Sequence, residues 1–241
     1  MIDVEDYIKK QIAVFQANER LEDRERRPGR GKEGGLFYGP YLLISREKGA
    51  GGNTVAQLVG SRLGWQVFDH QIVDEIAKKA NVRRQLIESL DERDQSRIQS
   101  IIGQLLTGEE IDQSEYLVLL KQIVLTLGHH GDVIIVGRGA RYILPSQFGL
   151  SVRMVAPIET RIRRIADSER LSLAAARVEV ERVDRARVKW VRRNLGHNVA
   201  DPLSHDLTIN TAEINVEAAA GVVITALQRK LGVQIKASRQ K

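Results

Sequence analysis

Three glycines lie within four residues of one another, shortly after a short apolar run. The run is Tyr41-Leu42-Leu43-Ile44, and the glycines are Gly49, Gly51 and Gly52. Helix-forming sequence follows at once, over residues 54–63. The order strand, glycine-rich loop, helix is typical of a phosphate-binding loop, where backbone amides converge on an anion at the positive end of a helix. The alternative is a tight turn that serves packing alone.

No lysine stands where a phosphate-binding loop usually has one. The usual pattern is G-x-x-x-x-G-K-[ST]. With Gly51 as the second glycine, Gly52 takes the lysine position and Asn53 the hydroxyl position. Moving the register by one residue brings Thr54 to the hydroxyl position but puts Asn53 in the place of the lysine. A side-chain oxygen of Thr54 or Asn53 could orient Mg²⁺, and an ordinary helix N-terminal residue is the alternative for Thr54.

Three cationic residues could replace the lysine if phosphoryl transfer occurs. Arg46 and Lys48 lie in the loop itself, and Arg138 follows a separate apolar run. An arginine can bind phosphate through two parallel hydrogen bonds. For Arg46, an ion pair with Glu47 or another nearby acid is the alternative. Arg138 stands between two glycines at a strand end, where a purely structural role is harder to find.

Five apolar runs predict five strands, and helical patterns separate them. The strands are expected at residues 41–44, 65–68, 132–136, 150–155 and 207–209. The helices are expected at residues 54–63, 70–80, 82–107, 112–127, 158–169, 172–190 and 215–231, with Asp112 as a cap and residues 82–107 projecting into solvent. Such alternation predicts an α/β fold with a five-stranded parallel sheet covered on both faces. Ligands of these sheets bind at the carboxyl ends of the strands, where the glycine loop, Asp69 and Arg138 all fall.

Residues 3–27 predict a further helix, separate from this body. Ile8, Ile12 and Phe15 form an apolar stripe at helical spacing, and a charged, glycine-bearing stretch follows. We therefore divide the chain into an N-terminal arm with its linker, residues 1–36, and a body at residues 37–235. Docking of the arm on the body, or on a second copy to give a homo-oligomer, is the hypothesis for its role.

Composition argues against several other classes of protein. The 241 residues include no cysteine and five scattered histidines, so neither disulfides nor a zinc site is expected. No apolar run approaches the ~20 residues of a membrane span. The N-terminus lacks a signal-peptide core, which makes the cytoplasm the expected location. Net charge is +6, and residues 151–193 hold twelve basic against six acidic residues, which favours anionic partners unless this block is a solvated helix face.

Five segments together resemble the cytidylate kinase-like family, in the nucleoside monophosphate kinase branch of the P-loop kinases. They are ISREKGAGG at residues 44–52, QVFDHQIVDEIAKKA at 66–80, VIIVGRGARYIL at 133–144, ERVDRARVKW at 181–190 and DPLSHDLTINT at 201–211. The loop form S-R-E-x-G-x-G-G, without a lysine, is itself a feature of this branch. The resemblance implies a P-loop NTPase-type three-layer core that binds ATP with Mg²⁺. It also implies a helical insert at residues 81–111 over the acceptor nucleotide and an arginine-rich lid at residues 181–200.

The resemblance further implies roles for individual residues. The donor phosphates would lie on Ser45, Lys48, Gly49, Ala50, Gly51, Gly52, Asn53 and Thr54, with Thr54 also a ligand of Mg²⁺. The arginines expected to act on the migrating phosphoryl group are Arg46, Arg138, Arg185 and Arg187. The acceptor would be held by Asp69, Arg138, Arg161, Arg164, Arg182 and Asp184. A helix N-cap is the alternative for Asp69, and surface exposure is the alternative for Arg161 and Arg164. Lid arginines three or five residues apart are expected to converge on one side of their helix.

The expected activity is ATP-dependent phosphoryl transfer to a nucleoside monophosphate, with CMP or dCMP as the acceptor. In-line transfer to an anionic phosphate requires positioning and charge neutralisation more than a strong base, so no histidine receives a role. One rival is a nucleotide-binding regulatory module that has lost transfer, which the missing lysine favours. The other is a nucleic-acid-binding protein that uses the basic block. Only Trp190 is nearby for base stacking, so no specific nucleic acid is expected as a partner. No membrane partner is expected either, because the sequence has no apolar run long enough for a span.

Overall fold

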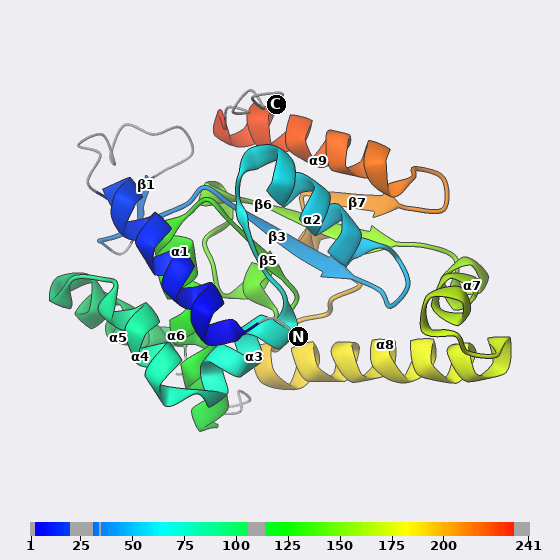
Figure 1. The fold of residues 1–241 in the computed structure, drawn as a ribbon, viewed down its shortest axis with the longest axis horizontal. Coiled ribbons are helices and arrows are strands. Elements are labelled where there is room, and N and C mark those ends of the chain that lie inside the picture. The colour runs from blue at the N-terminus through cyan, green and yellow to red at the C-terminus, as the bar shows by residue number, and fades with distance from the viewer. Residues whose placement is uncertain (1–2, 20–30, 34, 106–113, 234–241) are drawn as a thin grey trace.

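The main sheet has five parallel strands in the order β4-β5-β3-β6-β7. It is seen in a computed structural model that describes residues 3–19, 31–33, 35–105 and 114–233 (Figure 1). The strands are β3 (Tyr41–Arg46), β4 (Gln66–Phe68), β5 (Val133–Val136), β6 (Gly149–Val155) and β7 (Leu207–Asn210). The five strands and their parallel arrangement are therefore confirmed. Because β3 is central, the loop that follows it lies between the ends of β5 and β6.

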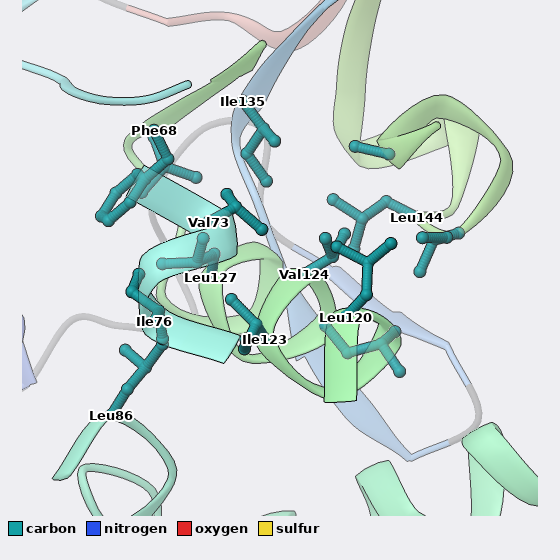
Figure 2. Close-up of a cluster of buried hydrophobic side chains, with 14 of the residues drawn as sticks. Phe68, Val73, Ile76, Leu86, Leu120, Ile123, Val124, Leu127, Ile135 and Leu144 are labelled. Carbon is teal, nitrogen blue, oxygen red and sulfur yellow. The ribbon is translucent and has the colours of Figure 1, made fainter. Parts of the chain in front are cut away.

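Helices cover both faces of the sheet. They are α1 (Val4–Glu19), α2 (Gly52–Leu63), α3 (His70–Lys78), α4 (Ala80–Glu88), α5 (Glu92–Leu105), α6 (Glu115–His130), α7 (Ile158–Glu169), α8 (Leu173–Leu195) and α9 (Val216–Leu231). Successive β3 side chains point to opposite faces, so Leu42 packs with α2 and α9 while Leu43 joins the core formed with α3 and α6. Figure 2 shows this second core, where Val73, Val124 and Ile135 converge. Burial on both faces explains the continuous apolar character of the strands.

The N-terminal helix α1 packs on the body of its own chain. Ile8 is fully buried, and the Tyr7 hydroxyl donates to the Val67 carbonyl at 2.9 Å. The ring of Phe15 stacks on the imidazole of His130 with centroids 4.0 Å apart. Residues 20–27 of the expected helix lie outside the described residues. The apolar stripe is thus engaged within one chain, against α3 and α4.

The end of the expected linker is structured. Gly31–Glu33 and Leu36–Tyr38 form a two-stranded antiparallel sheet, β1 and β2. Leu36 and Tyr38 are buried, and the Tyr38 ring stacks on Phe148 at 5.8 Å. A sequence rich in glycine and charge concealed this short sheet.

The insert is two helices, α4 and α5, rather than one projecting segment. Val82, Leu86, Ile98 and Ile102 are buried against neighbouring helices, so the expectation of a solvent-projecting helix was wrong. Apart from the buried Asp94, its charged residues lie toward the outer face of an amphipathic pair, which the composition alone does not reveal. Residues 106–113, including the expected cap Asp112, lie outside the described residues, and α6 begins after Ser114.

Helices α7 and α8 form a hairpin with its own small core, which extends beyond the sheet in Figure 1. Ser172 caps α8, accepting a hydrogen bond from the Ala175 amide at 3.2 Å, and Gly196 ends the helix in a left-handed conformation. The segment expected as a lid is therefore the second half of one long helix and the turn after it. Among the described residues, none of the helices combines the length and apolar character that crossing a membrane would require.

Candidate active site at the carboxyl edge of the sheet

The glycine loop after β3 adopts a conformation that side chains would prevent. Gly49 and Gly51 have φ angles of 83° and 74°, in the left-handed region that favours glycine. A Cβ on Gly49 would lie 2.7 Å from the Arg161 carbonyl oxygen. Helix α2 begins at Gly52 without a side-chain cap, so its first amides have no acceptor within the helix. The first amides of α2 and its positive end are therefore available to an anion at the end of the loop.

Two arginines of α7 donate hydrogen bonds to the backbone carbonyls of this loop. Arg161 is buried, and it donates to the Lys48 carbonyl at 3.2 Å and to the Asp184 carboxylate at 2.5 Å. Arg164 donates to the Gly49 carbonyl at 3.4 Å and to the Thr211 carbonyl at 2.7 Å. The Thr211 hydroxyl in turn donates to the Ala50 carbonyl at 3.0 Å. In this arrangement both arginines hold the loop backbone and are neither free for an acceptor nor exposed on the surface.

Arg46, Arg138 and Arg187 line a single cleft at the edge of the sheet, and we refer to them as the arginine cluster. Arg46 ends β3, and its Nη2 lies 3.1 Å from His70 Nδ1. Arg187 of α8 donates to the Arg46 carbonyl at 3.2 Å. Burial, with Arg187 and Arg138 nearby, lowers the pKa of Arg46 to about 9. Burial and Arg138 likewise lower the pKa of Arg187. An anion bound here would relieve the repulsion among the three cations.

Arg138 is held by partners from three elements. It has a φ of 52° between two glycines of positive φ, which turns the chain sharply after β5. Its guanidinium pairs with Asp74 of α3, and the Tyr116 hydroxyl of α6 donates to the same carboxylate at 2.7 Å. Its Cζ lies 5.8 Å from the centre of the Trp190 ring on α8. These contacts place a cation at the mouth of the cleft, between α3 and α8.

The charged residues of the lid segment divide between two faces of α8. Asp184 and Arg187 face the sheet, where Asp184 accepts a hydrogen bond from the Lys48 amide at 2.8 Å. Arg182 and Arg185 are exposed, and they bind Glu179 at 2.9 Å and Glu181 at 3.1 Å. The expected convergence of all three arginines is not observed, because residues two or five apart on a helix point in different directions. Arg187 is the lid arginine that reaches the cleft.

Other expected residues have local partners. Asp69 is the N-cap of α3, accepting from the Gln71 amide at 2.9 Å and the Ile72 amide at 3.0 Å. The Ser45 hydroxyl accepts from Arg153 at 3.3 Å. The Lys48 side chain pairs with Glu169 of α7 at 2.5 Å, away from the arginine cluster. The side chain of Lys48 is therefore engaged in an ion pair with α7 and does not line the cleft.

The N-terminal turn of α2 carries side-chain oxygens that suit a hydrated Mg²⁺ ion bound mainly through phosphates. Thr54 and Asn53 are exposed in the first turn of α2, and neither side chain makes a hydrogen bond within the described residues. Mg²⁺ keeps several waters and takes one or two protein oxygens, so a single hydroxyl or amide oxygen beside the loop suits it. Among the described residues there is no cluster of three carboxylate or imidazole ligands for a metal held by the protein alone.

The residues around the cleft that sequence reasoning missed include His70, Asp74, Tyr116 and Trp190. His70 and Asp74 are four residues apart in a helix that starts at a strand end, and this spacing puts both on one face. That spacing was the signal available in the sequence. The insert, by contrast, supplies no lining residue to this cleft over residues 81–105. Helix α3 supplies His70 to the lining of this cleft.

Comparisons with known proteins find similar sequences and a similar fold over most of this chain. The sequence profile of the cytidylate kinase-like family matches residues 42–213. A cytidylate kinase of Ignicoccus hospitalis is 28% identical over 192 residues, which are 79% of this chain and 98% of that protein. A cytidylate kinase of Sulfolobus acidocaldarius is 24% identical over 190 residues, 78% of this chain and 94% of that protein. The crystal structure of an uncharacterized protein from Eubacterium ventriosum superposes with a TM-score of 0.64 at 18% identity, covering 79% of this chain and 98% of that one. The family profile covers most of the body, and that body has a parallel sheet, a glycine loop and a cluster of arginines at the edge of the sheet. This chain therefore belongs to the cytidylate kinase-like family.

Proposed function

We propose that this protein is an ATP-dependent nucleoside monophosphate kinase that acts on CMP or dCMP. One observation carries the proposal: three arginines from three separate elements gather beside the amino end of α2, which has no side-chain cap. Phosphoryl transfer is catalysed mainly by positioning and by neutralising the charge on the transferred group. A site with this concentration of cations suits that reaction, and family membership supports a phosphotransferase.

Each part of the cleft has a role in this proposal. The loop amides and the start of α2 bind the donor phosphates. Arg46, which the His70 ring and the backbone of Gly137 confine, takes the place of the missing lysine beside the β- and γ-phosphates. Arg138 grips the acceptor phosphate, and Asp74 orients it. Arg187, on α8, places its positive charge beside the transferred phosphoryl group. The acceptor phosphate is already anionic at neutral pH, so no protein base has to remove a proton.

Mg²⁺ would be held by the donor phosphates with the side-chain oxygen of Thr54 or Asn53. When bound, the ion supplies positive charge that stabilises the phosphate oxygens. The exposed position of both side chains supports this assignment.

The choice of CMP or dCMP rests on the family and on the named relatives, both of which are cytidylate kinases. Trp190 lines the cleft together with Arg138, and a second hollow is lined by both Tyr116 and Trp190, aromatic rings that suit a planar base. We expect the base to lie there, next to α3 and α8.

The test is ADP release with ATP and Mg²⁺ against a panel of nucleoside monophosphates. CMP or dCMP should be turned over, and Arg138→Ala should lower kcat/KM roughly 10- to 100-fold by removing a charged hydrogen-bond donor. Arg177→Ala is the matched control, because Arg177 is an exposed α8 arginine that pairs with Glu159 at 2.6 Å. Turnover of another acceptor alone would contradict the choice of base. Equal losses in both variants would contradict the role of Arg138.

A regulatory nucleotide-binding module is the second candidate function. The observation in its favour is that Lys48 pairs with Glu169, and among the described residues no lysine lines the cleft of the arginine cluster. This candidate predicts ATP binding with no turnover of any acceptor. Titration calorimetry with ATP and Mg²⁺, run beside the ADP-release assay, distinguishes the two.

A further inference from the structure

His70 touches the arginine cluster through one hydrogen bond whose direction can be assigned. It is the first residue of α3, and its Nδ1 lies 3.1 Å from Arg46 Nη2. A guanidinium can only donate hydrogen bonds. His70 Nδ1 must therefore be the acceptor, which requires an imidazole that carries no proton on Nδ1. The neutral ring with its proton on Nε2 is the form that meets this requirement.

The charges around His70 keep the ring neutral. Arg46 faces it from β3, Arg138 from the turn after β5, and Arg187 from α8. Asp69, the preceding residue, is the one acid that favours the proton, and its carboxylate already caps the helix. Burial, Arg46 and Arg138 lower the pKa of His70. An imidazolium here would add a fourth positive charge and would lose its acceptor nitrogen.

Arg46 depends on this acceptor for its orientation. Within the described residues, the bond to His70 is the hydrogen bond made by its guanidinium, and its buried Nε has no partner. On the opposite side, a Cβ at Gly137 would collide with Arg46 Nη1, so the glycine leaves the space that the guanidinium fills. A side chain with several rotatable bonds is thus confined between a glycine and a histidine.

We propose that His70 is a positioning residue, a neutral acceptor that aims the Arg46 guanidinium at the phosphates of the donor nucleotide. It is neither a cationic phosphate ligand nor a general base. This inference rests on the proposed function for its kinetic consequences. Its structural part, namely the tautomer of His70 and the hydrogen bond to Arg46, does not depend on turnover.

The first test is imidazole nitrogen NMR of the full chain, with the His70 signals assigned by their loss in His70→Asn. We expect the Nε2-protonated tautomer and a pKa below the ordinary value of about 6.5. In Arg46→Ala, the pKa of His70 should rise toward the ordinary range, because a neighbouring cation has been removed. An Nδ1-protonated ring, or a charged ring at neutral pH, would overturn the proposal. This readout holds even if no acceptor is phosphorylated.

The second test measures ATP affinity with Mg²⁺ by calorimetry, and kcat/KM where turnover exists. His70→Asn retains a side-chain oxygen acceptor and should stay within about threefold of the parent, whereas His70→Leu lacks an acceptor and should lose about tenfold. In an Arg46→Ala background the further substitution His70→Leu should have no effect, because the two residues act as one unit. Equal losses in His70→Asn and His70→Leu, or additive losses with Arg46→Ala, would refute positioning. Urea unfolding of each variant separates these effects from general destabilisation.

Discussion

Alanine at Gly137 should damage the site far more than it damages the fold. Gly137 follows β5 with a φ of 87°, and its missing side chain leaves room for the Arg46 guanidinium. Gly64, at the end of α2, has a φ of 70° and nothing within 4 Å of the position that a Cβ would take. The two positions therefore share the same backbone strain, and only one of them contacts the arginine cluster.

The expected magnitudes follow from these two contacts. A left-handed conformation costs an alanine about 1–2 kcal/mol, so Gly137→Ala and Gly64→Ala should each lower the free energy of unfolding by about that amount. At Gly137 the new methyl group also forces Arg46 out of its place. Loss of one charged hydrogen bond to phosphate costs about 1.5–3 kcal/mol, which corresponds to a roughly 10- to 150-fold loss of ATP affinity.

Urea unfolding and calorimetric ATP titration of both variants provide the assay. Gly64→Ala should be destabilised yet bind ATP as the parent chain does. Gly137→Ala should show similar destabilisation and the large loss of affinity. If both variants bind ATP equally well, Arg46 does not contact the donor phosphates from this position, and the reasoning fails.

Three further predictions concern the lid helix, the pH response and the arm. Arg187→Ala should lower kcat/KM roughly 10- to 100-fold, whereas Arg185→Ala should change it less than about threefold; the reverse order in steady-state assays would mean that α8 turns its other face to the substrates. Burial, Arg46 and Arg138 lower the pKa of His70, and a protonated ring cannot accept a hydrogen bond from Arg46, so calorimetry should show ATP affinity falling when the pH drops low enough to protonate His70. The linked contribution of His70 to stability should be lost over the same range as pH falls, since the unfolded chain then binds more protons than the folded chain. Phe15→Ala should lower the unfolding free energy by about 3–5 kcal/mol, because the ring is buried against His130; a halved mass by light scattering would show that the stripe joins two copies instead.

The sequence by itself determined the sheet, the glycine loop and the identity of the main cations. Apolar runs such as residues 133–136 define strands that are buried on both faces, and this pattern is encoded locally. Gly49 and Gly51 occupy positions with positive φ, which favour glycine over other residues, so the tight loop appears in the sequence as a glycine-rich stretch. Arg46 and Arg138 stood out because both lie just beyond the ends of apolar runs in the sequence.

Tertiary structure alone decided which charged side chains face the cleft. Arg161 and Arg187 are equally basic in the sequence, yet one braces the loop and the other lines the cleft, because the packing of α7 and α8 sets the direction of each. The roles of His70 and Asp74 depend on the neighbours of α3, which the strand order β4-β5-β3 brings together from distant segments. A periodic pattern specifies the face of a helix that is buried, but not the residues that the opposite elements place against it.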